Sequence, residues 1–205
     1  MINILQKRPL CLASSSPRRK MFLEKFNLQF ECHKPKIEEK PKSDENAKNF
    51  VKRMANEKAQ YVNKKFYKSS KDIVVLSGDT IVFINSQILG KPLNAQEAKK
   101  MLQLLSNKTH KVFSGFSIFD SKSKIVITDV ISTEVTFQKL DESKIEWYIK
   151  TKEPFGKAGS YSIQGLGSIL IKSISGSYNN VVGFPIEHIF PYLIKNGCIT
   201  FGVKK

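Results

Sequence analysis

The sequence contains few cysteines, and their spacing matches no known bonding pattern. Cys11, Cys32 and Cys198 are odd in number and far apart, which excludes a zinc motif and a disulfide framework. This pattern favours a reducing cytoplasm and buried, unreactive thiols. The chain also lacks an apolar run of the roughly 18 residues that a membrane-spanning helix needs. Polar and basic residues at 6–8 interrupt the start, where a signal peptide would have its apolar core. We therefore expect a cytoplasmic protein with no membrane association.

Arginine is scarce although the chain is strongly basic. Among 34 basic residues only Arg8, Arg18, Arg19 and Arg53 are arginines, and with 18 acidic residues the formal net charge is +16. Such a charge indicates an anionic partner, such as nucleic acid, a nucleotide or an acidic surface. The lysines are spread along the whole chain, so a general lysine bias explains them at least as well. The arginines are more informative, because a guanidinium can bind a phosphate through two parallel hydrogen bonds.

Apolar periodicity predicts strands and helices that alternate first and are followed by an antiparallel block. The predicted strands are 9–13, 28–33, 73–76, 81–84, 87–89, 111–119 and 124–137. The predicted helices are 17–26, a long helix capped by Ser43, 95–105, 141–151 and a last one over 185–195, interrupted or kinked at Pro191. Residues 153–182 read as loops and short strands. The fold class is therefore mixed α/β with one extended sheet.

Residues 12–19, Leu-Ala-Ser-Ser-Ser-Pro-Arg-Arg, indicate the end of a strand, a turn of hydroxyl side chains and a helix start. Ser16 can be the N-cap and Pro17 the first helical residue. Two arginines in the first turn lie at the positive end of the helix dipole, where an anion would relieve their unfavourable position. The hydroxyls, guanidinium groups and exposed backbone N–H groups favour a phosphate-binding turn. The alternative is a solvated helix start in a lysine-rich protein.

Five charged residues elsewhere could complete such a site. Asp79 follows the buried run 73–76, where open α/β sheets place their ligands, and it could be a metal ligand, a general base or a turn-forming residue. Glu38 and Glu39 lie in a lysine-rich loop and are either solvated or, together with Asp79, able to hold Mg²⁺. Lys58 lies on the apolar side of its helix, so it either snorkels or reaches into a pocket. Lys91 follows the predicted hairpin in a stiff turn.

The segment 153–165 is unusually rich in glycine, with one Tyr and one Gln. Glycine is costly to order unless the backbone must approach something closely. Gln164 carries both a donor and an acceptor and suits the edge of a base. The alternative is an irregular surface loop. The three histidines have no acidic or nucleophilic companion in the sequence and are interpreted as structural, and Trp147 as a core residue.

Eight segments in order carry a resemblance to a known family. They are residues 12–19, 37–39, Arg-Met-Ala-Asn-Glu-Lys-Ala at 53–59, Gly-Asp-Thr at 78–80, Lys-Pro at 91–92, Leu-Ser-Asn-Lys-Thr-His at 105–110, 153–165 and 176–185. Together they resemble the Maf family of nucleoside triphosphate pyrophosphatases, and residues 157–165 are similar to the branch that acts on dTTP and UTP. Asn107 and Ser162 stand where glycine is common in that family, which leaves the local loop geometry open.

The resemblance implies an elongated mixed β-sheet with flanking helices, as in the Maf and ITPase folds. It implies a single domain over 1–205 with an active-site cleft between two lobes. The implied reaction is cleavage of a nucleoside triphosphate between the α- and β-phosphates, giving a monophosphate and pyrophosphate with Mg²⁺ or Mn²⁺. A cytoplasmic enzyme, often a homodimer, is also implied.

The resemblance also assigns roles to individual residues. Asp79 would be the general base and would place the metal with Glu39. Phosphate binding is carried over to Ser14, Arg18, Arg19, Lys58 and Lys91. Substrate choice is carried over to Arg18, Thr80 and Gln164, so that Arg19 serves charge alone.

Two other interpretations remain for this sequence. One is the same fold acting on 7-methyl-GTP or on modified purine nucleotides. The other is a non-catalytic nucleic-acid-binding protein, suggested by the net charge of +16. The second would bind with a steep salt dependence and would not need Asp79. Because the sequence lacks clusters of arginine and aromatic residues, no specific nucleic acid is expected as a partner.

Overall fold

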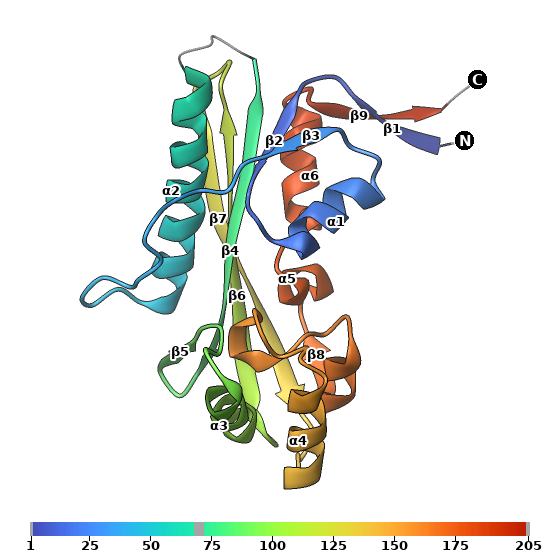
Figure 1. Ribbon diagram of the computed structural model, residues 1–205. Helices are drawn as coiled ribbons and strands as arrows, with labels where there is room; N and C mark the ends of the chain where they lie inside the picture. Colours follow the sequence, from blue (N-terminus) through green and yellow to red (C-terminus); the bar gives the residue numbers. More distant parts are fainter. Residues whose placement is uncertain (1, 68–71, 204–205) are drawn as a thin grey trace. The chain divides into compact units, whose positions relative to one another are not determined.

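The computed structural model describes residues 2–67 and 72–203 (Figure 1). Its strands are β1 (Ile2–Gln6), β2 (Leu10–Ala13), β3 (Phe30–Cys32), β4 (Val74–Ile84), β5 (Gln87–Leu89), β6 (Thr109–Asp120), β7 (Val126–Phe137), β8 (Ile171–Ser175) and β9 (Ile199–Val203). Its helices are α1 (Pro17–Lys25), α2 (Ala47–Tyr67), α3 (Ala95–Leu105), α4 (Glu142–Lys150), α5 (Tyr178–Val182) and α6 (Ile186–Lys195), with 3₁₀ turns η1 (Ala158–Ser160) and η2 (Leu166–Leu170). The predicted mixed α/β class is confirmed.

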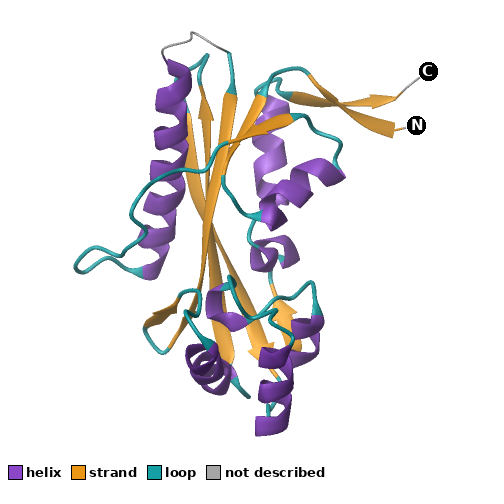
Figure 2. Ribbon diagram, in the orientation of Figure 1, coloured by secondary structure: helices purple, strands orange, loops and turns teal. Residues whose placement is uncertain are grey.

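Most strands belong to one mixed sheet with the order β3-β2-β4-β6-β7-β8, in which β5 pairs with β4. Strand β2 runs parallel to both β3 and β4, whereas β5 is antiparallel to β4 and β8 is antiparallel to β7. Strands β1 and β9 form a separate antiparallel pair, which the sequence pattern did not predict (Figure 2). No helix among the described residues is long and apolar enough to cross a membrane.

The chain divides into two compact units. Unit 1 comprises residues 1–79, 115–130 and 183–205, and unit 2 comprises 80–114 and 131–182. Strands β4, β6 and β7 contribute residues to both units.

Helix α2 covers the sheet in unit 1 (Figure 1). Its predicted apolar face is confirmed, because Val51, Met54 and Ala55 are fully buried. The Ser77 hydroxyl of β4 donates to the carbonyl of Ala55 at 2.5 Å, so the polar atoms at this contact are satisfied. Helix and strand therefore meet closely enough to position side chains between them.

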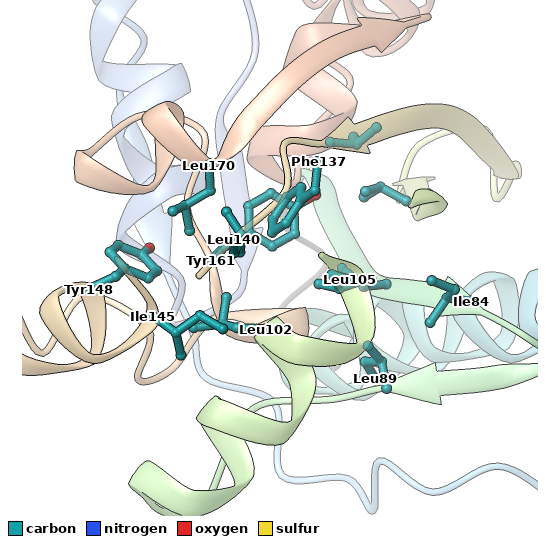
Figure 3. Packing of buried hydrophobic residues seen from close by; sticks show 13 residues of the cluster. Ile84, Leu89, Leu102, Leu105, Phe137, Leu140, Ile145, Tyr148, Tyr161 and Leu170 are labelled. Carbon is teal, nitrogen blue, oxygen red and sulfur yellow. The ribbon is translucent and has the colours of Figure 1, made fainter. Parts of the chain in front are cut away.

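A second core fills unit 2 (Figure 3). Helices α3 and α4 pack there with the ends of β6 and β7. The largest buried side chains include Tyr148, Phe137, Leu102 and Leu105, and Tyr161 lies against Phe137 with ring centroids 4.8 Å apart. This core carries the glycine-rich segment that follows α4.

Several local expectations are corrected by the structure. The long helix begins at Ala47 rather than after Ser43, because the side chain of Asn46 accepts the backbone N–H of Asn49. Helix α6 continues through Pro191. Cys32 and Trp147 are exposed rather than in the core, and Cys32 lies on the short edge strand β3.

Two turns depend on residues that tolerate a positive φ. Asn85 and Ser86 adopt φ values of 48° and 61° between β4 and β5, which confirms the predicted hairpin. Asn107 has a φ of 56°, in the left-handed region that glycine favours and asparagine tolerates. The replacement of glycine at this position is therefore compatible with the loop.

Candidate active site

The parallel pairing of β2 with β4 creates the site in unit 1. Their register runs to the pair Ala13↔Ser77, after which β2 turns into α1 while β4 continues through Gly78 and Asp79. Asp79 thus lies inside a strand of eleven residues rather than after its end, and it is β2 that ends at this level. Asp79 therefore lies level with the C-terminal end of β2 and the start of α1. Open α/β sheets bind their ligands at such a strand end.

Arg19 is built into this turn. Ser16 is the N-cap and Pro17 the first helical residue, as predicted, although the Ser16 side chain makes no capping hydrogen bond. The hydroxyl oxygen of Ser14 instead accepts the Ser16 backbone N–H at 3.1 Å and Arg19 Nη1 at 3.3 Å. Arg19 Nε donates to the carbonyl of Gly183 at 2.9 Å. The turn is therefore ordered by a buried guanidinium.

The two arginines differ in burial. Arg19 is buried, and burial lowers its pKa although the Asp79 charge opposes the change. Arg18 is half-buried, and burial lowers its pKa as well. A Cβ at Gly78 would lie 3.2 Å from Arg19 Nε, so glycine lets this guanidinium lie against β4.

Lys58 reaches the acidic residues rather than snorkelling to solvent. Its Nζ lies 2.6 Å from Asp79 Oδ1 and 3.0 Å from Glu39 Oε2. Lys58 and Asp79 are buried, whereas the Glu39 side chain is 48% exposed. Because one ammonium is shared by two carboxylates, the three groups carry a net negative charge.

The neighbouring glutamates are separated by the fold. Glu38 pairs with Lys40 at 2.7 Å, and both side chains are more than 70% exposed. Glu39 instead contacts Lys58. The sequence left open whether these two glutamates are solvated or join Asp79. Glu38 is solvated, whereas Glu39 shares the Lys58 ammonium with Asp79.

Arg53 holds the loop that carries Glu39, and sequence reasoning missed it. Its guanidinium donates to the Lys40 carbonyl at 2.9 Å, to both Glu45 carboxylate oxygens at 2.7 and 2.6 Å, and to Glu57 at 3.2 Å. The hydrogen bonds from Arg53 lower the pKa of Glu45 to about 2. The scarcity of arginine was the signal that could have singled it out.

Unit 2 carries Thr80, Lys91 and Gln164. The Thr80 hydroxyl lies 2.7 Å from that of Ser114, which donates to the Asn180 carbonyl at 2.9 Å. Lys91 and Gln164 are exposed. The backbone beside Lys91 is joined to the glycine-rich segment, because the Gly159 N–H donates to the carbonyl of Gly90 at 3.0 Å.

The buried His110 contacts Tyr161 rather than a predicted site residue. His110 Nε2 lies 2.8 Å from the Tyr161 hydroxyl, and its Nδ1 has no hydrogen-bond partner within the described residues. Burial lowers the pKa of His110 to about 4, so the ring is neutral at neutral pH. Its contacts fit the predicted structural role.

Comparison with known proteins shows the family. Residues 9–196 match the model of the family described as Maf-like protein. The chain belongs to the Maf family.

Three curated relatives of this Maf chain carry the name dTTP/UTP pyrophosphatase. That of Syntrophus aciditrophicus is 38% identical over 94% of this chain and 92% of its own. That of Bacillus cereus (strain ATCC 14579) is 44% identical over 89% and 92%, and that of Halalkalibacterium halodurans is 42% identical over 94% and 98%. The solved Staphylococcus aureus Ham1 protein matches 92% of this chain and 100% of its own at 12% identity, with a TM-score of 0.48.

Glu39 and Asp79 of this Maf chain are the carboxylates that could bind a metal. Within 2–67 and 72–203, no three His, Cys, Asp or Glu side chains gather at one point. Glu39 and Asp79 nevertheless approach one cation, the Lys58 ammonium, from two sides. Two carboxylates fit a divalent cation that takes its other ligands from substrate phosphates and water, as Mg²⁺ does in phosphate-transferring sites.

Proposed function

We propose that this chain hydrolyses nucleoside triphosphates between the α- and β-phosphates, with dTTP and UTP as preferred substrates. The observation that carries the proposal is the cluster of Asp79, Lys58 and Glu39 beside the turn ordered by Arg19. Carboxylates that can receive a proton thus lie next to cations that can hold phosphates. The names of the Maf relatives support the substrate class.

Charge neutralisation and an oriented water are the main requirements of phosphoryl chemistry. Ser14, Arg18 and Arg19 bind phosphate oxygens at the start of α1. Asp79 accepts the proton of the attacking water as the bond between the α- and β-phosphates breaks and pyrophosphate leaves. Lys58 orients the Asp79 carboxylate through their 2.6 Å contact.

Glu39 and Asp79 would hold the divalent metal, Mg²⁺ or Mn²⁺. When bound, such an ion supplies positive charge to the phosphate oxygens and lowers the pKa of a coordinated water. In unit 2, Lys91 adds charge for the triphosphate, while Thr80 and Gln164 select the base. The cleft between two lobes, the homodimer and the cytoplasmic location stay predictions.

The first test compares carboxylate variants of this site. Asp79→Asn should lower pyrophosphate release from dTTP by about 100-fold or more, because it removes the general base. Glu39→Gln should also lower it, whereas Glu38→Gln is the matched control, since Glu38 lies on the same loop but pairs with exposed Lys40. Circular dichroism checks that each variant is folded. Near-normal turnover in Asp79→Asn would contradict the mechanism.

The same assay, run on a panel of nucleoside triphosphates, tests the substrate class. We expect turnover of dTTP and UTP with Mg²⁺ or Mn²⁺ and none after chelation of the metal. Preference for 7-methyl-GTP or a modified purine would contradict the pyrimidine assignment. Salt-sensitive binding of nucleic acid without any turnover would contradict the enzyme.

A further inference from the structure

We propose that Glu153 is a positioning residue for substrate selection: its carboxylate anchors the backbone on both sides of Gln164. The proposal rests on the function proposed above, in which Gln164 reads the base. All the residues concerned lie in unit 2.

The Glu153 carboxylate accepts hydrogen bonds on both of its oxygens. Its Oε1 accepts the Tyr148 hydroxyl at 2.9 Å and the backbone N–H of Gly167 at 2.9 Å. Its Oε2 accepts the backbone N–H of Leu166 at 2.9 Å. Burial raises the pKa of Glu153, but these hydrogen bonds prevail and lower it overall. The residue is therefore an anion at neutral pH.

Tyr148 extends the anchor to the other side of Gln164. Its hydroxyl oxygen accepts the backbone N–H of Ser162 at 3.1 Å while its proton goes to Glu153. The Tyr148 ring is fully buried in the unit 2 core (Figure 3). The backbone is thus held two residues before Gln164 and two and three residues after it.

The glycines of this segment are explained by the same contacts. A Cβ at Gly165 would lie 2.1 Å from Glu153 Oε2, and a Cβ at Gly167 would lie 2.5 Å from the Tyr148 hydroxyl. Such distances leave no room for a side chain. The close approach that glycine permits here is an approach by the protein's own carboxylate and phenol.

This arrangement holds an exposed side chain on a rigid backbone. Gln164 is exposed, and the backbone that carries it is anchored before and after it. A side chain that discriminates between bases must be placed to within a fraction of an ångström by its supporting residues. The fixed backbone at Ser162, Leu166 and Gly167 provides that support.

The test uses Glu153→Gln in the full chain. An amide can keep only one of the two acceptor oxygens, so at least one backbone N–H or the Tyr148 hydroxyl then faces an NH₂ group. We expect faster hydrogen exchange at the amide of Leu166 or of Gly167, whichever faces the NH₂ group, with unchanged exchange in α3. The matched control is Glu146→Gln, because Glu146 lies on α4 with an exposed side chain and pairs only with Lys99 among the described residues.

The second measurement is substrate discrimination. The ratio of kcat/KM for UTP to that for a purine triphosphate should fall roughly tenfold in Glu153→Gln, as expected for the loss of a charged hydrogen bond. General damage to the fold would lower both values alike and leave the ratio unchanged. Tyr148→Phe, which retains the buried ring, should show a smaller change in the same direction and serves if Glu153→Gln does not fold.

The outcomes separate this proposal from the one on which it rests. Unchanged exchange at Leu166 and Gly167 would overturn the anchoring role. Faster exchange with an unchanged ratio would overturn its link to substrate choice. A wild-type chain that turns over no nucleoside triphosphate would overturn the proposed function and the specificity role together, while the exchange data would still decide the anchoring.

Discussion

At the residue scale, Arg53 combines four hydrogen bonds in one planar group. It joins Glu45 and Glu57 to the Lys40 carbonyl, one residue after Glu39. A guanidinium that also fixes a backbone carbonyl sets geometry as well as charge. Lysine cannot reproduce this fork, because it is a single point charge.

We therefore predict that Arg53→Lys lowers kcat several-fold. The loop carrying Glu39 loses its anchor, while the loss of stability should be only about 1 kcal/mol. Steady-state kinetics at a temperature where the variant is folded, together with thermal unfolding, separate the two effects. Lys52→Gln, on the exposed side of the same helix, should change neither. Wild-type kcat in Arg53→Lys would show that Glu39 needs no support from Arg53.

At the element scale, helix α2 approaches β6 closely at one glycine. A Cβ at Gly115 would lie 2.3 Å from the carbonyl oxygen of Val51, which is part of the helix backbone and cannot rotate away. The helix carries Lys58, so this contact helps to set the distance between Lys58 and Asp79. The absence of a side chain at Gly115 is thus part of how the site is built.

Gly115→Ala should destabilise the protein by about 2 kcal/mol, the usual cost of overpacking a core. Urea unfolding measures this directly. The control is Gly90→Ala, because a Cβ at Gly90 would meet nothing within 4 Å. Equal stability of the two variants would mean that α2 can shift away from the sheet at little cost.

At the scale of the whole molecule, acid sensitivity should begin in unit 2. Burial lowers the pKa of His110 from its usual 6.5 to about 4. In unit 1, the hydrogen bond from Arg8 lowers the pKa of Asp120 from 3.8 to about 2. The two groups therefore titrate in different pH ranges.

Between pH 6.5 and about 4, His110 is protonated in the unfolded chain but neutral in the folded chain. The free energy of unfolding therefore falls as the pH is lowered through this range. The full difference corresponds to about 3 kcal/mol. The contribution of Asp120 is present above pH 3.8 and is lost only as the pH falls through about 2. Urea unfolding of wild type and His110→Gln at pH 7.5, 6 and 4.5 measures the first range. We expect a smaller loss in the variant, and parallel curves would refute the assignment to His110.

The sequence by itself determined those features whose physical cause is local. The turn from β2 into α1 follows from Ser16 and Pro17, and the β4–β5 hairpin follows from Asn85 and Ser86, which accept a positive φ. The apolar face of α2 was predictable because helical periodicity depends only on neighbours within the helix. The segments of the Maf family were recognisable for the same reason, since each is continuous in the chain.

Only the tertiary structure decided between alternatives that depend on distant residues. It placed Lys58 between Asp79 and Glu39 and left Glu38 in solvent, although both glutamates have the same charge in the same loop. The tertiary structure also explains why residue 165 is a glycine. A side chain there would meet the carboxylate of Glu153, which lies twelve residues earlier in the chain. Such outcomes require the positions of side chains on separate elements. Local propensity and periodicity contain no information about those positions.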